Sequence, residues 1–193
     1  LPPGYKLYVK EAPSQRLRKW RKISEYKEML KIPNVRMIHP SVHPKQIYEK
    51  CSLVITIVGS AGFEAAFYEK PSIVFGNVLY TKLPSVSKVK DIETLPQLIR
   101  NKLKQKVNAI DLERFLTILK ENTFEFDMVE FASIIADKFY HNESSVDVEI
   151  DELEVKEFIK NNIELIEMLS SVHIKKIEQH KKQAEITRQK SKL

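Results

Sequence analysis

Residues 52–76 read SLVITIVGSAGFEAAFYEKPSIVFG, an apolar run followed by a turn of small residues and a second apolar run. The first run, residues 53–58, lacks alternation, which is typical of a strand buried on both faces in a parallel sheet covered by helices. The turn at 59–62 lets the backbone approach a ligand, and the helix start beyond it offers free N–H groups. We interpret this stretch as a β-turn-α-β unit that holds an anionic ligand, above all a phosphate.

The length, the hydrophobic content and the cysteine count favour a globular protein of a reducing compartment. The chain has 193 residues, 42% of them hydrophobic, and its single cysteine, Cys51, excludes an internal disulfide. No apolar run reaches the ~20 residues that a membrane span needs, and no signal peptide is visible. We therefore expect a cytoplasmic location, with peripheral attachment at the inner face of the membrane as an alternative. Because the chain starts at Leu1 rather than at methionine, we also expect a piece of a longer protein.

The net charge of +6 is concentrated at the two ends of the chain. Residues 1–36 carry ten Lys and Arg against three Glu, and residues 175–193 carry seven against two, so the middle is mildly acidic. No stretch interleaves aromatic with basic residues, as single-stranded nucleic-acid binding requires. We therefore expect no nucleic-acid partner.

Periodicity predicts alternating strands and helices over residues 1–140. This order is typical of an α/β domain with a doubly wound, mostly parallel, Rossmann-like sheet, which we assign to residues 1–142. The expected strands are 5–9, 35–38, 53–58, 73–75 and 86–89, and the expected helices are 16–31, 45–50, 95–106, 112–122 and 128–140.

Residues 143–193 are predicted to form an acidic linker and a long basic helical tail. Residues 141–145 have the composition of a linker, and neither Gly nor Pro follows them. An apolar stripe from Val155 to Ile177, an acidic start and a basic end suit one long helix. The stripe fades after Ile177, so disorder, self-association and contact with a partner or the membrane surface stay open for the last turns.

Three loops follow the predicted strands, at 10–15, 39–43 and 59–64, and should meet at the carboxyl edge of the sheet. There the 59–62 backbone would hold a phosphate, Glu64 would accept hydrogen bonds from sugar or ribose hydroxyls, His39 would donate to a phosphate or a base, and Lys10 would supply countercharge. The plain alternatives are a common turn, a strand cap and a surface ion pair. No Walker loop, G-x-G-x-x-G, hydrolase elbow or metal-ligand cluster is present.

Four motifs together resemble a known family: K-E-A-P-S at 10–14, I-H-P-S at 38–41, V-G-S-A-G-F-E-A at 58–65 and K-P-S-I-V-F-G at 70–76. They look like bacterial capsule and surface polysaccharide biosynthesis proteins, which are similar to GT-B glycosyltransferases. The resemblance covers about residues 5–100. It implies a C-terminal Rossmann-like half that binds a nucleotide-sugar donor without a bound metal, so no cofactor is expected. Ser60, Ala61 and Gly62 would meet the phosphates, Glu64 the donor hydroxyls and His39 the nucleotide.

One position departs from the pattern of that family. Its first loop usually reads K-E-H-P, and this chain has Ala12 in place of the histidine, which puts the role of the loop in doubt. The acceptor half of a GT-B enzyme, which usually carries the catalytic base, is missing from this stretch of chain. The catalytic residues are therefore not assigned, and the isolated chain is expected to be inactive.

The sequence thus predicts the donor-binding half of a glycosyltransferase in surface or capsular polysaccharide biosynthesis. Its partners would be a nucleotide-sugar donor, a saccharide or lipid-linked acceptor, and the missing N-terminal half. Two alternatives stay open, a nucleotide-sugar 2-epimerase-like enzyme and a non-catalytic scaffold of the same fold that docks through its tail. The candidate donor-binding residues are Lys10, His39, Ser41, Gly59, Ser60, Ala61, Gly62 and Glu64.

Overall fold

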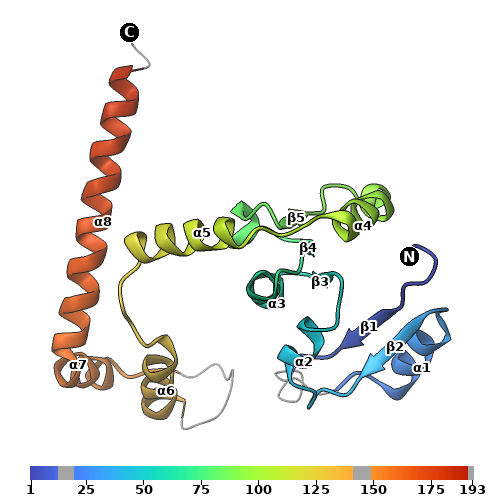
Figure 1. Cartoon of the computed structure of the whole chain (residues 1–193). Coiled ribbons are helices and arrows are strands. Elements are labelled where there is room, and N and C mark those ends of the chain that lie inside the picture. The colour runs from blue at the N-terminus through green and yellow to red at the C-terminus, as the bar shows by residue number, and fades with distance from the viewer. Residues whose placement is uncertain (13–19, 141–148, 191–193) are drawn as a thin grey trace. The chain divides into compact units, whose positions relative to one another are not determined.

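The computed structural model describes residues 1–12, 20–140 and 149–190, which divide into two compact units, Leu1–Phe124 and Glu125–Leu193 (Figure 1). The first unit carries the strands of the described residues, and the second is helical. The predicted linker at 141–145 and the predicted boundary between 142 and 143 lie outside the described residues, so that boundary stays a prediction.

The five described strands pair only in parallel, which confirms the predicted α/β class. They form a two-stranded sheet, β1-β2, and a three-stranded sheet with the order β3-β4-β5. Helical segments connect consecutive strands within each sheet or between them, as parallel pairing requires. The strands are β1 (Leu7–Lys10), β2 (Val35–Ile38), β3 (Val54–Thr56), β4 (Ser72–Val74) and β5 (Val86–Lys88).

The strand that is buried on both faces is β4 rather than β3. Ser72, Ile73 and Val74 have no exposed surface, because β4 lies between β3 and β5. The apolar run at 53–58 forms a strand of three residues at the edge of this sheet, and its last two residues, Ile57 and Val58, are 70% and 53% exposed. The prediction of a fully buried strand at 53–58 is therefore wrong.

The core of the first unit lies on both faces of β4. Successive side chains of a strand point to opposite faces, so Val74 and Ile73 join two separate clusters. Each buried side chain of this size contributes about 2 kcal/mol of hydrophobic stabilisation. The first cluster holds Ala66, Val74, Leu83, Val86 and Leu112, and the second holds Ile73, Val89 and Ile99.

The described residues form both α-helices and short 3₁₀ helices. Several begin where the sequence supplies a cap, as at Asn108 and Asp127, whose side-chain oxygens accept backbone N–H groups of the first turn at 2.8 to 3.0 Å. They are α1 (Ile23–Lys31), α2 (Pro44–Tyr48), α3 (Ala61–Glu64), α4 (Leu95–Lys104), α5 (Ala109–Asn122), α6 (Met128–Phe139), α7 (Glu152–Asn161), α8 (Ile163–Lys190), η2 (Ala65–Tyr68), η3 (Leu79–Lys82) and η4 (Ile92–Thr94).

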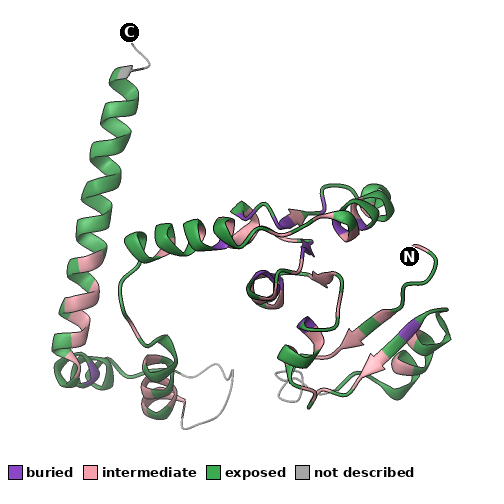
Figure 2. Ribbon diagram, viewed as in Figure 1, coloured by how far each residue is buried: buried purple, intermediate pink, exposed green. Residues whose placement is uncertain are grey.

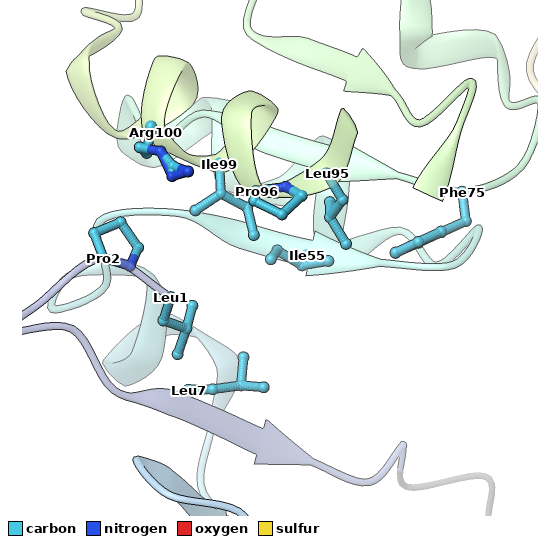
Figure 3. A pocket seen from close by; sticks show the side chains of 9 residues that line it. All are labelled: Leu1, Pro2, Leu7, Ile55, Phe75, Leu95, Pro96, Ile99 and Arg100. Carbon is cyan, nitrogen blue, oxygen red and sulfur yellow. The ribbon is translucent and has the colours of Figure 1, made fainter. Parts of the chain in front are cut away.

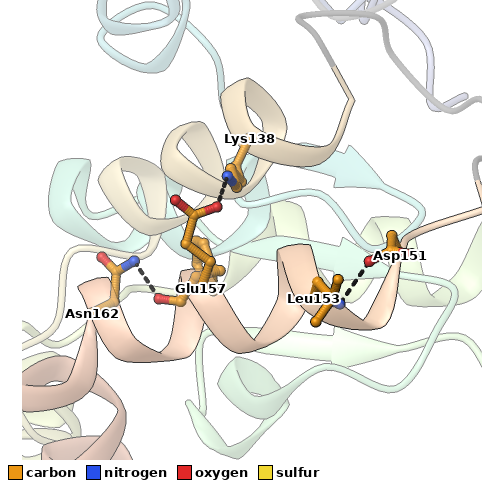
Figure 4. Close-up of polar contacts among 6 residues, drawn as sticks. Lys138, Asp151, Leu153, Glu157 and Asn162 are labelled. Atoms are coloured by element: carbon orange, nitrogen blue, oxygen red, sulfur yellow. Dashed lines mark hydrogen bonds and ion pairs between the residues drawn. The ribbon is translucent and has the colours of Figure 1, made fainter.

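Two predicted helices differ from those of the structure. The helix expected over 16–31 begins at Ile23, where the backbone N–H of Lys22 donates to the Glu25 carboxylate at 2.8 Å; residues 16–19 lie outside the described residues. The long helix expected in the second unit is two helices, α7 and α8, which are interrupted at Asn162. Asn162 leaves the helical conformation, with φ −121° and ψ 28°, and its side-chain amide donates to the Phe158 carbonyl at 2.9 Å (Figure 4).

In the second unit α6 contacts α7 through an ion pair and an aromatic pair. Asp151 caps this helix by accepting the Leu153 N–H at 2.7 Å, and Lys138 of α6 forms an ion pair with Glu157 at 3.0 Å (Figure 4). The rings of Phe139 and Phe158 contact each other, with centroids 5.1 Å apart. Figure 2 shows α8 partly covered near its start and exposed beyond Val172.

A buried lysine joins α4 to the segment before β5. Lys102 is 5% exposed, and its ammonium donates to the carbonyls of Pro84 and Ser85 at 3.1 and 3.0 Å and to the Gln105 side chain at 2.7 Å. Burial lowers the pKa of Lys102 to about 8, although three acceptors around one ammonium favour its charged form. The side chain therefore fixes helix and strand to each other at some cost in desolvation.

Candidate functional site

The predicted site residues follow the carboxyl ends of three parallel strands. Lys10 ends β1, His39 comes directly after β2, and the turn 59–64 follows β3. The register of the β1-β2 sheet sets Lys10 opposite Ile38, the residue before His39. Glu11 forms an ion pair with Arg21 at 2.6 Å rather than with Lys10. Residues 13–15 of the first loop lie outside the described residues.

His39 and Ser41 hold each other in the loop after β2. Nδ1 of His39 lies 2.7 Å from the Ser41 hydroxyl oxygen and accepts the Ser41 backbone N–H at 3.2 Å. Because a backbone N–H can only donate, Nδ1 carries no proton, and the proton of the neutral ring is on Nε2. Both side chains are exposed. The ring therefore caps this loop and still has an Nε2–H donor for a ligand.

The turn after β3 leaves two backbone donors without an acceptor. Gly62 donates to the Gly59 carbonyl at 3.2 Å, and Phe63 and Glu64 both donate to the Ser60 carbonyl at 2.8 Å. The backbone N–H groups of Ser60 and Ala61 make no hydrogen bond to any residue that the structure describes. Two adjacent N–H groups of this kind can bind an anionic oxygen.

The two glycines of the turn face protein atoms. A Cβ atom at Gly62 would lie 3.0 Å from the Tyr80 ring and 3.2 Å from the Thr56 methyl group, and one at Gly59 would lie 2.9 Å from the Thr56 hydroxyl. The Tyr80 hydroxyl also donates to the Gly59 carbonyl at 2.5 Å. The absence of a side chain at these glycines therefore leaves room for Tyr80 and Thr56 to pack against the turn. The donor-binding role predicted for Gly59 and Gly62 rests on their backbone groups and stays a prediction.

Two hydroxyl groups hold the Glu64 carboxylate. Tyr48 donates to Oε2 at 2.9 Å and Ser60 donates to Oε1 at 2.7 Å. Burial first, and then the hydrogen bond to Glu64, raise the pKa of Tyr48, so its phenol keeps the proton that it donates. A carboxylate accepts about four hydrogen bonds, so each oxygen can accept one more from a ligand.

Sequence reasoning missed Tyr48 and Tyr80. Tyr48 lies in the helix predicted at 45–50 and is buried, at 6% exposure. Tyr80 lies in a segment expected to be irregular, which forms η3, and its ring stacks on Phe63 with centroids 5.9 Å apart. Nothing in the local pattern around Tyr80 indicates a contact with a turn some twenty residues earlier.

A separate pocket of about 590 Å³ lies in the first unit, and Figure 3 shows it. Leu7 of β1 and Ile55 of β3 are among its lining residues, which are all apolar except Arg100. None of the predicted donor-binding residues lines it. Its walls are Leu1, Pro2, Leu7, Ile55, Phe75, Leu95, Pro96, Ile99 and Arg100.

Residues 2–113 match the family model described as "Capsule polysaccharide biosynthesis protein". The chain belongs to the capsule polysaccharide biosynthesis protein family. The matched region runs from the segment before β1 into α5, so it includes all three strand ends of the candidate site. No curated protein matches the chain, and neither does any solved structure.

No group of three or more His, Cys, Asp or Glu side chains within residues 1–12, 20–140 and 149–190 could hold a metal ion. In the same part of the chain, none of the helices has the length and apolar character to cross a membrane.

Proposed function

We propose that this chain is the donor-binding half of a glycosyltransferase in capsule polysaccharide biosynthesis. The observation that carries the proposal is the turn after β3, where two backbone N–H groups without an acceptor lie in the same turn as the carboxylate of Glu64. The N–H groups of Ser60 and Ala61 suit the phosphates of a nucleotide sugar. The carboxylate repels a phosphate but accepts hydrogen bonds from sugar hydroxyls, so the pair suits a ligand that has both groups.

In this mechanism the protein stabilises the departing nucleotide. Negative charge builds on the phosphate oxygens as the bond to the sugar breaks, and fixed N–H donors stabilise that charge without reorganising. The Nε2–H of His39 would contact the nucleotide, and Lys10 would add positive charge beside it. The proposal assigns the catalytic base and the acceptor site to the acceptor-binding half of the enzyme, and it places the reaction at the cytoplasmic side of the membrane.

The proposal includes one doubly wound sheet with the order β2-β1-β3-β4-β5. Each sheet of the described residues ends in a strand with an unpaired edge, β1 in one and β3 in the other. Leu7 of β1 and Ile55 of β3 already line one apolar pocket. Pairing these two edges would satisfy their backbone groups and would bring Lys10 and His39 beside the turn after β3.

Titration calorimetry of the full chain with UDP-, CMP- and GDP-sugars tests the proposal. We expect one class of nucleotide sugar to bind, and Glu64→Gln to weaken that binding about tenfold or more, because an amide accepts sugar hydroxyls less strongly than a carboxylate. Glu49→Gln, at an exposed carboxylate on the preceding segment, is the matched control and should bind as the wild type does. A folded chain that binds none of these ligands contradicts the proposal.

Neither alternative gains support from the site. An epimerase needs catalytic carboxylates from both halves of its cleft, and Glu64 is the one carboxylate of the turn 59–64. A scaffold that docks through its tail would leave the free N–H pair and the oriented carboxylate without a purpose.

A further inference from the structure

Glu64 is oriented by a group from a different element of the fold. Tyr48 is the last residue of α2, which connects the loop after β2 to β3, and its hydroxyl reaches Oε2 of Glu64 at 2.9 Å across sixteen residues of sequence. The ring is 6% exposed and contacts Tyr68, with centroids 5.3 Å apart. A packed ring fixes the position of its hydroxyl oxygen, whereas Ser60, the second donor to Glu64, is exposed.

We propose that Tyr48 is a positioning residue that orients the Glu64 carboxylate toward the hydroxyls of the donor sugar. With Tyr48 on Oε2 and Ser60 on Oε1, both oxygens and therefore the plane of the carboxylate are defined. One acceptor position remains on each oxygen, and two such positions side by side match two neighbouring hydroxyls of a sugar ring. This inference rests on the proposed function and specifies which part of the donor the Tyr48–Glu64 pair recognises.

The same contact links two loops of the candidate site. The N-terminus of α2 is capped by His43, whose Nδ1 accepts the Lys45 N–H at 3.3 Å, and its C-terminal residue is Tyr48. A five-residue helix with both ends fixed is a short, stiff connection. The Tyr48 hydroxyl therefore connects the end of this helix to the turn that carries Glu64, while His39 is held separately by Ser41.

Tyr48→Phe tests the proposal, because it removes the hydroxyl and keeps the ring. Tyr68→Phe is the matched control, since the Tyr68 hydroxyl has no hydrogen-bond partner in the described part of the chain. Calorimetry compares each full-length variant with the wild type, for the nucleotide sugar that binds and for its parent nucleotide, UDP, CMP or GDP. We expect Tyr48→Phe to weaken sugar-nucleotide binding about tenfold, the usual effect of losing a hydrogen bond to a charged group, and to leave nucleotide binding within about twofold.

A spectroscopic measurement separates this orienting contact from general packing. In protein labelled at the tyrosine Cζ carbon, the Tyr48 signal should move in Glu64→Gln, because a carboxylate accepts a hydrogen bond more strongly than a neutral amide. The Tyr48→Phe spectrum identifies the signal, and Glu49→Gln should leave it in place.

The outcomes are distinct. Equal losses for nucleotide and nucleotide sugar in Tyr48→Phe, or no loss at all, overturn the positioning role and leave the proposed function standing. A Tyr48 signal that ignores Glu64 also overturns it. A wild-type chain that binds no nucleotide sugar overturns the proposed function and this inference with it, whatever the spectrum shows.

Discussion

The two sheets of the first unit both consist of parallel strands and are buried to very different extents. In the β3-β4-β5 sheet the whole of β4 is inaccessible to solvent, and apolar clusters cover both of its faces. In the β1-β2 sheet Val35 is the one buried residue of the described strands, and Tyr8 is 57% exposed. The β3-β4-β5 sheet is therefore well packed around its central strand, whereas the faces of the β1-β2 sheet are less covered, and each sheet has an edge strand, β3 or β1, next to which a further strand can pair.

The candidate site is divided along the same line. Glu64 and the free N–H pair belong to the well-packed sheet and are held by Tyr48, Ser60 and Tyr80. His39 and Lys10 belong to the other sheet, where His39 is fixed by Ser41 alone. Under the proposed function, the sugar and the phosphates would contact the packed sheet, and the contacts of His39 and Lys10 with the nucleotide would depend on how the β1-β2 sheet is placed.

The largest effect is the expected difference in stability loss between two single variants that each truncate one isoleucine to alanine, one in each sheet. Ile73→Ala empties a fully buried position of β4 and should lower the free energy of unfolding by about 3 to 4 kcal/mol. Ile38→Ala, at a half-buried position of β2, should cost about 1 kcal/mol or less. Urea unfolding followed by circular dichroism and by the single tryptophan, Trp20, measures both. Equal costs would remove the distinction between the two sheets.

A smaller effect is expected at the turn after β3. Gly62→Ala places a methyl group 3.0 Å from the Tyr80 ring and should destabilise the chain by about 2 kcal/mol. In the double variant with Tyr80→Ala the same substitution should cost much less, since the clash is gone. Thermal unfolding of the four proteins measures this coupling. Additive costs would show that Tyr80 does not support the turn.

A smaller effect again is expected from Lys102, and it depends on pH. Its pKa is about 8 in the folded chain and 10.5 in the unfolded chain, so between these values the unfolded chain binds more protons. Stability should therefore rise as the pH increases from 8 to 10.5, by on the order of 1 kcal/mol. Below pH 8 the lysine is charged in both states and contributes no such slope.

Lys102→Met should abolish this rise and change stability little at pH 7. In this variant the Ser85 carbonyl still accepts a hydrogen bond from the Ser72 N–H. The Pro84 carbonyl still accepts one from the Gln105 side-chain amide. Lys104→Met, on the exposed side of the same helix, is the control and should keep the wild-type pH dependence. Urea unfolding at pH 7, 8, 9 and 10 provides the comparison, and an unchanged slope in Lys102→Met would contradict it.

The smallest effects are expected in the hydrogen exchange of single backbone amides. They test whether the two sheets are separate or form one sheet. The N–H groups of Leu7 and Val54 point into their own sheets, where they donate to Asn34 and Pro71. Those of Tyr8 and Ile55 alternate to the opposite edges. If β1 and β3 pair in one sheet, hydrogen exchange of Tyr8 and Ile55 should be about as slow as that of Leu7 and Val54, each new bond adding about 1 kcal/mol. Fast exchange at both would contradict the single sheet.

The local pattern of the sequence predicted the elements well and their lateral positions poorly. The strands at 35–38 and 86–89 and the helices α4, α5 and α6 lie within a few residues of the expected ranges, because apolar spacing and caps act over single turns. The pattern named 53–58 as the buried strand, but burial depends on which strand has neighbours on both sides, and β4 has them. The helix break at Asn162 was missed because neither Gly nor Pro marks it.

The sequence by itself determined the alternation of parallel strands with helices, the family, and the presence of Glu64 in a small-residue turn, since each depends on residues close together in the chain. Only the tertiary structure decided that Gly62 makes room for Tyr80 and that Tyr48 holds Glu64. These contacts join residues sixteen or more positions apart, and no periodicity of the chain encodes them. The physical reason is that a carboxylate is positioned by the donors that packing brings to it, wherever those donors lie in the sequence.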